Sequence, residues 1–281
     1  MKSTIQTMQM RDGETLRVAK FEPDGPVLGV LQLLHGFGEH IGHYEKLCAF
    51  LAQNGYACVV HDQRGFGEMP GKTPKERARA RGVVPSYAAF LGDIAEIREK
   101  IAKWFTGLPV FLFGCSMGGN IALNLLLQSP ESYAKAIVES PWLRLYKPLP
   151  GPVSAFAGLL GRLSPRLAIR TRLNTAAISR DQGEVGRLVN DGIFHDRMSF
   201  RLYSEIVAAG ESAIAGASQI ATPTLLLCAG ADRIVSAPAI RELAKNAGPN
   251  LRLEEFDGGF HCLHHDILRA EIEERILSFL K

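Results

Sequence analysis

Short apolar runs alternate along this chain with stretches whose apolar residues are spaced three or four positions apart. The first pattern is typical of strands buried on both faces of a parallel sheet, and the second predicts helices that pack on such a sheet. The predicted strands cover residues 27–34, 57–60, 110–113, 135–138, 224–229 and 251–256. The predicted helices cover residues 44–51, 85–104, 120–126, 237–247 and 263–280, the last of which contains His264 and His265.

Residues 4–21 follow a different pattern, because two partly alternating stretches flank Asp12-Gly13, a favoured pair in tight turns. We expect an antiparallel hairpin there, at the edge of the sheet. Elsewhere strands and helices alternate, which predicts an α/β fold with a mostly parallel, doubly wound sheet of about eight strands.

The alternation stops between residues 143 and 218, where no comparable strand pattern occurs and a Pro/Gly-rich segment precedes an apolar helical stretch. This segment predicts a mainly helical cap inserted into a core domain made of residues 1–142 and 219–281. Residues 141–180 contain seven basic and no acidic residues, whereas the whole chain has a net charge of +3. The rest of the chain therefore sums to −4, so the positive charge is local to the cap.

The basic, apolar cap has two interpretations that remain open. It can lie on an anionic lipid surface as a peripheral membrane contact, or it can be an ordinary packed cap with a solvated rim of arginines, which is the interpretation we favour. Nucleic-acid binding is not expected, because the basic residues lack interleaved aromatic residues. The sequence leaves the oligomeric state open.

The composition is that of a globular protein of 281 residues, with 46% hydrophobic and 22% charged residues. No apolar run approaches the length of a membrane span, and the N-terminal residues are too polar for a signal peptide, so we expect a cytoplasmic protein. The five cysteines lie in apolar segments without metal-type spacing, which predicts buried, reduced thiols.

The candidate nucleophile is Ser116, within the sequence Gly114-Cys115-Ser116-Met117-Gly118. The apolar run before it predicts a strand and the residues after it predict a helix, which is the context that a G-x-S-x-G turn requires. A side chain at Gly114 or Gly118 would collide with a neighbouring strand or helix in so sharp a turn. The serine hydroxyl would then project above the N-terminal amides of the following helix.

A glycine-rich loop follows the strand at 27–34 and reads His35-Gly36-Phe37-Gly38-Glu39-His40. Such a loop lets backbone amides point into a site, so the amides of Phe37 and Met117 are our candidates for an oxyanion hole. His35, Gly36 and Gly38 are expected to support the site, and the side chains of His35, Glu39 and His40 to hold the loop by hydrogen bonds. After the next strand, Asp62 and Arg64 are expected to pair with one another or with the backbone.

Two later loops supply candidates for an acid and a base. Asp232 follows the strand at 224–229, and His261 follows the last strand after two glycines, so both fall at the edge of the sheet where Ser116 lies. The chain order Ser116, Asp232, His261 is that of the α/β-hydrolase triad. In such a triad the serine attacks an acyl carbonyl, the histidine moves its proton and the aspartate orients the imidazole. His261 and His264 form an H-x-x-H pair without supporting carboxylates or thiolates, so no metal site is predicted there.

Taken together, HGFGEH, HDQRGFG, GLPVFLFGCSMGGNIAL, NDGIFHDRMSFRLYSEI, GADRIVS and GGFHCLHHD resemble the monoglyceride lipase and lysophospholipase branch of the α/β-hydrolases, the serine-aminopeptidase-like group. The resemblance covers nearly the whole chain, in order. It implies an oxyanion loop at residues 35–38, a cap at 143–218 that shapes an acyl tunnel, no cofactor, and a monoacylglycerol or related single-chain ester as substrate. Two positions depart from the group: Cys115 stands where histidine is usual, and Asp191-Gly192-Ile193 replaces an Asp-Pro-Leu turn.

Other functions remain open because the cap sets selectivity. The chain could be a short-chain or hydroxycinnamoyl esterase, a thioesterase or an acyltransferase, which chain-length dependence would distinguish. A non-catalytic ligand-binding protein on the same fold would not react with a fluorophosphonate. Dehalogenase and epoxide-hydrolase chemistry is excluded, because both need a carboxylate where Ser116 stands.

Overall fold

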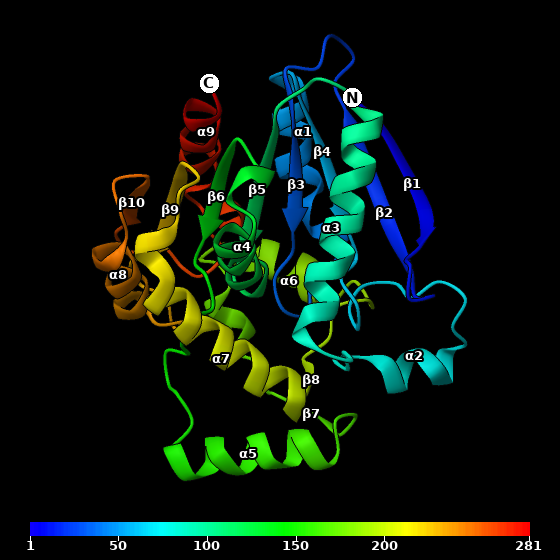
Figure 1. Cartoon of the computed structure of the whole chain (residues 1–281), viewed down its shortest axis with the longest axis vertical. Helices are drawn as coiled ribbons and strands as arrows, with labels where there is room; N and C mark the ends of the chain where they lie inside the picture. The colour runs from blue at the N-terminus through cyan, green and yellow to red at the C-terminus, as the bar shows by residue number, and fades with distance from the viewer.

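The computed structural model describes residues 1–281 and is built on one eight-stranded sheet (Figure 1). The strands lie in the order β1-β2-β4-β3-β5-β6-β9-β10. Their bounds are β1 Lys2–Gln9, β2 Thr15–Glu22, β3 Gly29–Leu34, β4 Tyr56–His61, β5 Val110–Cys115, β6 Lys135–Glu139, β9 Thr224–Ala229 and β10 Leu251–Phe256. All eight strands lie within residues 1–142 and 219–281, the predicted core.

The pairing follows the predicted pattern. β1 and β2 form the antiparallel hairpin, and β2 pairs antiparallel with β4. All later pairs are parallel, so the carboxyl ends of β3, β5, β6, β9 and β10 share one edge of the sheet. Every residue of β3, β4, β5 and β9 is buried, as their unalternating apolar runs predict.

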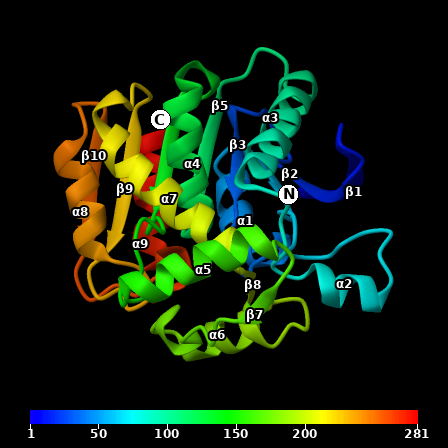
Figure 2. The same cartoon turned by 60° about the horizontal axis from the view of Figure 1, so that its bottom comes forward.

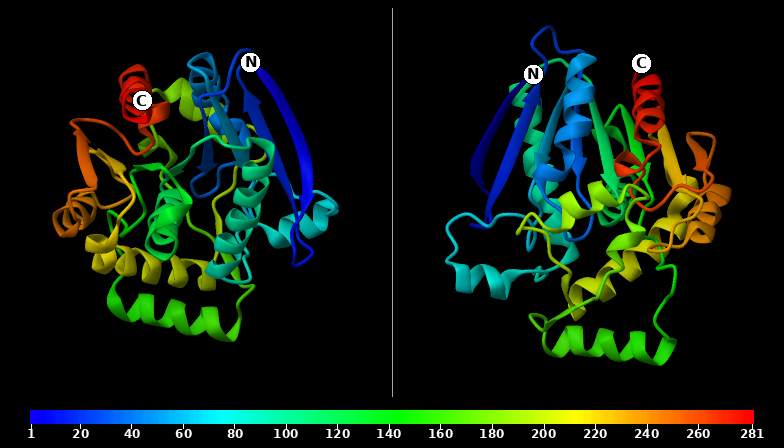
Figure 3. Two further views of the ribbon diagram at one scale, coloured as in Figure 1. Left: turned by 45° about the horizontal axis from the view of Figure 1, so that its top comes forward. Right: turned by 180° about the vertical axis from the view of Figure 1, so that it is seen from behind.

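Helices cover both faces of the sheet, and Figure 3 shows the two sides. One buried apolar cluster joins one face of the sheet to α3 Tyr87–Trp104, α4 Met117–Gln128, α7 Phe200–Gly216 and α8 Ala237–Asn246. A second cluster joins the opposite face to α1 Glu45–Gln53, α6 Gln182–Val189 and α9 Arg269–Leu280. The sheet is therefore doubly wound, as predicted. The capping-box helix α2 Pro74–Ala80 lies outside both clusters and buries no residue.

Residues 143–218 are mainly helical and contain α5 Gly151–Leu163, α6 and α7, together with a small two-stranded sheet of β7 Ala168–Arg170 and β8 Arg197–Ser199. α5 lies at the outer end of the molecule, across α7 from the main sheet (Figures 1 and 2). α7 packs against α4 and α8 of the core. The segment is thus attached through α7 and α6, while α5 is the most peripheral part of it. No helix in the structure combines the length and apolar character that crossing a membrane requires.

Two local expectations were wrong. His264 and His265 lie in a 3-10 turn, Leu263–His265, that precedes α9. Ile267, an apolar residue within the predicted helix at 263–280, precedes α9 and is 65% exposed. The apolar spacing in the sequence continues from residue 263 to residue 280. The backbone, however, is extended at Asp266, so the helix starts only after it, where the N–H of Arg269 donates to the carbonyl of Asp266.

Asp62 and Arg64 also do not pair with one another. Asp62 accepts the backbone amides of Ile41 and Glu68, in keeping with the backbone contact that we expected as the alternative. Arg64 forms a buried, two-point ion pair with Asp93 of α3. The sequence around Arg64 does not show that this residue contacts α3, whose Asp93 lies 29 residues further along the chain.

Candidate active site

Ser116 occupies a sharp turn between β5 and α4. Its backbone has φ 55° and ψ −115°, a left-handed conformation that residues other than glycine rarely adopt. A methyl group at Gly114 would overlap the carbonyl oxygen of Gly118, and one at Gly118 would overlap the carbonyl oxygen of Leu34. The turn therefore needs both glycines, and its close approach to β3 brings Ser116 toward the loop that follows that strand.

The carboxyl ends of β5, β9 and β10 bring three predicted residues together. The Ser116 hydroxyl lies 2.8 Å from Nε2 of His261, and Nδ1 of His261 lies 2.7 Å from Oδ2 of Asp232. Oδ1 of Asp232 accepts the backbone amides of Ile234 and Val235, which fixes the carboxylate. A neutral imidazole in this arrangement donates its Nδ1–H to the aspartate and presents its Nε2 lone pair to the serine hydroxyl.

The three side chains are nearly excluded from solvent, with 5% of Ser116, 5% of Asp232 and 4% of His261 exposed. Burial opposes the charged form of His261, but the Asp232 carboxylate, together with Glu39 and Glu139, outweighs burial and raises the pKa of His261 above its ordinary value. The ring can therefore take a proton from a serine at little cost and hold it beside a compensating charge.

The loop after β3 presents a free amide. The N–H of Phe37 has no hydrogen-bond partner within the protein, whereas the N–H of Gly36 is bound by the Glu39 carboxylate at 2.7 Å. Met117 begins α4, where first-turn amides have no intrahelical acceptor. Both candidate backbone N–H groups are thus free to donate a hydrogen bond to a bound ligand. Phe37 lines the same cavity as Ser116 and His261.

The other predicted residues of the loop hold it in place. Nε2 of buried His35 accepts the amide of Gln63 at 2.8 Å, and its Nδ1–H donates to the carbonyl of Gly36 at 2.7 Å. Burial lowers the pKa of His35 to about 4, so the ring is neutral near pH 7. Glu39 accepts hydrogen bonds from Gly36 and from the Tyr44 hydroxyl, and Gly38 takes a positive φ of 81° against the backbone of His195.

A cavity of about 680 Å³ opens onto Ser116 and His261. Apolar side chains from the core and from residues 143–218 dominate its wall, including Trp142, Leu145, Phe194, Phe200, Tyr203 and Ile234. The volume falls within the range of small-molecule sites, about 300–1,000 Å³. A cavity of this size with a mainly apolar wall is suited to an apolar ligand.

A match to a known family decides the class of the protein. The family model described as serine aminopeptidase, S33, matches residues 25–267. The chain belongs to this family. The predicted α/β-hydrolase family and fold are confirmed, and with them the enzyme class, a carboxylic ester hydrolase.

This S33-family chain is similar to several known proteins over most of its length. Human monoglyceride lipase is 27% identical over 91% of this chain and 82% of its own length. An uncharacterized abhydrolase domain-containing protein of Dictyostelium discoideum is 28% identical over 100% of this chain, which spans only 29% of that relative. Among solved structures, the monoacylglycerol lipase of Paleococcus ferrophilus is 31% identical, with a TM-score of 0.84 and coverage of 94% of this chain and 98% of that chain.

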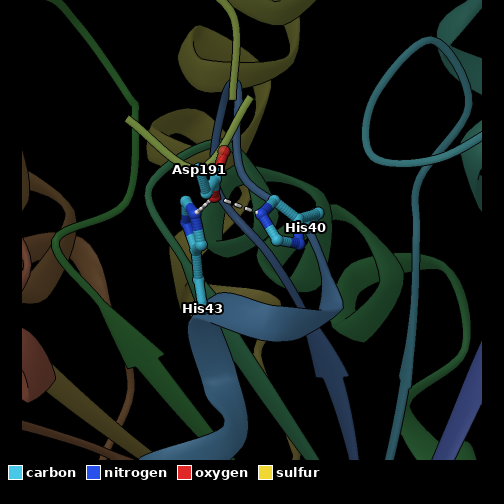
Figure 4. Close-up of side chains that lie close together, drawn as sticks. All are labelled: His40, His43 and Asp191. Atoms are coloured by element: carbon cyan, nitrogen blue, oxygen red, sulfur yellow. Dashed lines mark hydrogen bonds and ion pairs between the residues drawn. The ribbon is translucent and has the colours of Figure 1, made fainter. Parts of the chain in front are cut away.

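One contact that the sequence did not predict joins the loop after β3 to residues 143–218. Nε2 of His40 and Nε2 of His43 lie 2.6 Å and 2.9 Å from the same oxygen of Asp191, which follows α6 (Figure 4). Because His40 accepts the Gly42 amide at Nδ1, its Nε2 carries the proton and donates to Asp191. That ring therefore has no free lone pair for a metal ion in this arrangement. The spacing His-x-x-His is the only local signal of the cluster.

A second buried cluster lies behind the nucleophile turn. Nδ1 of His264 contacts a carboxylate oxygen of Glu139 at 2.8 Å, and Sγ of Cys115 lies 3.6 Å from the same oxygen. The thiol of Cys115 points to this cluster and does not line the cavity. Hydrogen bonding to Cys262 and burial raise the pKa of the Cys115 thiol, so the thiolate that a metal would need is disfavoured. Glu139 is the last residue of β6. A carboxylate at the end of a buried strand is the only signal of this cluster in the sequence.

Proposed function

We propose that this protein hydrolyses single-chain acyl esters, monoacylglycerols or lysophospholipids, through an acyl-enzyme formed on Ser116. The observation that carries the proposal is the hydrogen-bonded order Ser116, His261, Asp232, of which Ser116 and His261 line a mainly apolar cavity. A serine hydroxyl is a weak nucleophile until a base removes its proton, and His261 lies within reach to do so.

The reaction would proceed in two displacements. Oγ of Ser116 attacks the ester carbonyl carbon while its proton passes to Nε2 of His261, giving a tetrahedral oxyanion. The carbon–oxygen bond to the alcohol then breaks, and the alcohol leaves with the proton from Nε2. A water molecule repeats the sequence on the acyl-serine and releases the fatty acid.

Two groups are proposed to stabilise the charges that develop. The Asp232 carboxylate holds the imidazolium formed on His261 and keeps Nε2 directed at the serine. The backbone amides of Phe37 and Met117 donate to the oxyanion, supported by His35, Gly36 and Gly38, which hold the loop. Donors fixed in advance in a site that excludes water are the largest single source of rate acceleration in such reactions.

The cavity and the relatives named above support the proposed substrate class. An apolar wall binds one acyl chain, and the volume leaves no room for several chains of membrane-lipid length. Residues 143–218 are proposed as the cap that forms the outer wall, since Phe194, Phe200 and Tyr203 all belong to it. The carboxylic ester of a monoacylglycerol or lysophospholipid then sits at Ser116.

The cap is also proposed to contact membranes through α5. Four large apolar side chains of this helix are exposed, Val153 by 48%, Phe156 by 60%, Leu159 by 51% and Leu163 by 72%. A contiguous exposed apolar face with nearby arginines is a feature of helices that lie in a lipid interface. This location would let the enzyme collect a poorly soluble substrate.

Vesicle sedimentation tests the membrane contact. The double variant Phe156→Gln/Leu163→Gln should bind vesicles that contain anionic lipid at least several-fold more weakly than the wild type. Ile5→Gln is the matched control, because Ile5 is a 52% exposed apolar residue of the distant edge strand β1. Equal sedimentation of the wild type and the double variant would contradict the contact.

The hydrolytic proposal is tested by fatty-acid release from a long-chain 2-monoacylglycerol, a lysophospholipid and an acetyl ester, with Ser116→Ala as the blank. Preference for either long-chain substrate supports the proposal. Preference for the acetyl ester would favour a short-chain esterase, and equal rates for the wild type and the folded variant would overturn the nucleophile.

A further inference from the structure

Four basic side chains line the cavity that contains Ser116. Lys147 lies in the segment before α5, Arg170 and Arg172 lie at and after β7, and Arg233 follows β9. Three separate parts of the chain therefore bring positive charge to one cavity. Glu39 is the single acidic residue of the wall, and Gly36 and Tyr44 already occupy its carboxylate.

These cations lack the partners that neighbouring arginines have. Lys147, Arg172 and Arg233 form no side-chain ion pair or hydrogen bond, and Arg170 has one distant carboxylate contact, with Asp196 at 3.8 Å. By contrast, Arg144 is paired with Glu211 and Glu242, and Arg180 is paired with Asp266. The cations of the wall are therefore available to a ligand. Arg162 and Arg166, exposed residues outside the wall, are unpaired as well, so it is their position around one cavity that sets the wall cations apart.

The backbone conformation of Arg172 also indicates that its side chain has a functional role. Its φ is 54°, a left-handed conformation that is unfavourable for a residue with a side chain and that is concentrated at functional sites. The backbone amide of Arg172 is held by Asp196 at 3.2 Å, while its guanidinium stays unpaired. The main chain is thus anchored in a strained conformation with a free cationic side chain at the cavity.

We propose that these cations bind the phosphate of the substrate head group, so that the protein prefers single-chain esters that carry an anionic phosphate. The proposal rests on the ester hydrolysis proposed for Ser116. The apolar wall takes the acyl chain, and the unpaired arginines, whose planar donors match phosphate oxygens, take the other end. A neutral glycerol needs no such charges, and a choline group would meet no free carboxylate.

The test compares two substrates that differ only in the phosphate, octanoylglycerol and octanoylglycerol phosphate, both below their micelle-forming concentrations. At low salt we expect kcat/KM to be at least about tenfold higher for the phosphate. In Arg172→Gln/Arg233→Gln this ratio should fall about tenfold. The preference should also decline as salt rises, since the screening length shrinks from about 10 Å at 0.1 M to about 3 Å at 1 M.

Arg162→Gln/Arg166→Gln is the matched control, because both arginines are exposed cap residues that do not line the cavity. It removes the same charge and should keep the wild-type ratio. A direct readout uses Ser116→Ala, in which calorimetric titration with octanoylglycerol phosphate should show about tenfold weaker binding when Arg172 and Arg233 are also replaced.

The possible results distinguish the head-group site from the hydrolytic role of Ser116. No hydrolysis of either ester, with phosphate-dependent binding retained, would overturn the hydrolytic role and support the head-group site. Hydrolysis with equal kcat/KM for both esters would overturn the head-group site alone. If the Arg172/Arg233 variant loses only its sedimentation with anionic vesicles, the cations contact a membrane surface and the head-group site is overturned.

Discussion

The contact between Asp191 and two histidines makes a strong prediction about stability. Replacing Asp191 with alanine removes the acceptor of the Nε2–H groups of His40 and His43, whose side chains are 8% and 2% exposed. The same carboxylate accepts the backbone amides of Ile193 and Phe194, both at 2.8 Å. Burial raises the pKa of Asp191, but the hydrogen bonds from His43 and His40 outweigh burial and lower it, so the carboxylate is charged near pH 7.

The cost can be estimated from these contacts. A buried donor left without a partner costs about 1–3 kcal/mol, and two histidine donors are affected. Because the Asp191 side chain is itself 22% exposed, water can partly replace it, and we expect a loss of about 2–4 kcal/mol. That is a large part of a typical stability of about 5–15 kcal/mol.

Denaturant unfolding measures this change, and Glu274→Ala is the control because Glu274 is an exposed helical carboxylate without an ion pair. Activity should change as well, because Gly38 of the candidate oxyanion loop packs on His195 and Phe194, close to Asp191 in the chain. We expect kcat to fall more than KM rises. If Asp191→Ala unfolds at the same midpoint as Glu274→Ala, the contact does not hold the cap to the loop.

Three substitutions and one pH profile probe the nucleophile turn and its base. Gly118→Ala should destabilise the fold and abolish most activity, because the methyl overlaps the Leu34 carbonyl; a variant with wild-type melting and kcat would contradict the close approach. A plot of kcat/KM against pH should rise through the pKa of His261, which lies above 6.5, because only the neutral ring accepts a proton. Asp232→Asn should move that midpoint to lower pH and reduce kcat by about 10⁴, as in serine proteases, whereas an unchanged profile would assign the orientation of the ring to another group. Cys115→Ala should lower stability by about 1 kcal/mol and leave kcat/KM within about twofold, since its thiol faces Glu139; loss of turnover in a folded variant would oppose that placement.

The strands and the loops that carry the candidate site could be predicted from sequence for a physical reason. A buried parallel strand needs an unbroken apolar run, and parallel strands end at a common edge, so residues that follow them in the chain meet in space. Ser116, Asp232 and His261 each follow such a run. Their convergence requires no knowledge of individual side-chain contacts.

Other features depend on contacts that no local pattern encodes. Asp191 lies 151 residues from His40 in sequence, and its position depends on how the cap folds back on the loop after β3. The pairing of Arg64 with Asp93 likewise depends on how α3 packs, and the 3-10 turn at His264 interrupts an apolar spacing that looks continuous. The two contacts have partners on distant elements, whereas the turn at His264 is a local break that apolar spacing does not reveal.

Covalent labelling with a fluorophosphonate, followed by peptide mass mapping, identifies the nucleophile. We expect one label per chain, on Ser116, with parallel loss of ester hydrolysis. His261→Ala should slow labelling at least about a thousandfold, and Ser116→Ala should abolish it while the protein stays folded. Labelling at another residue with full loss of activity, or unchanged hydrolysis after Ser116 is labelled, would show that Ser116 is not the nucleophile.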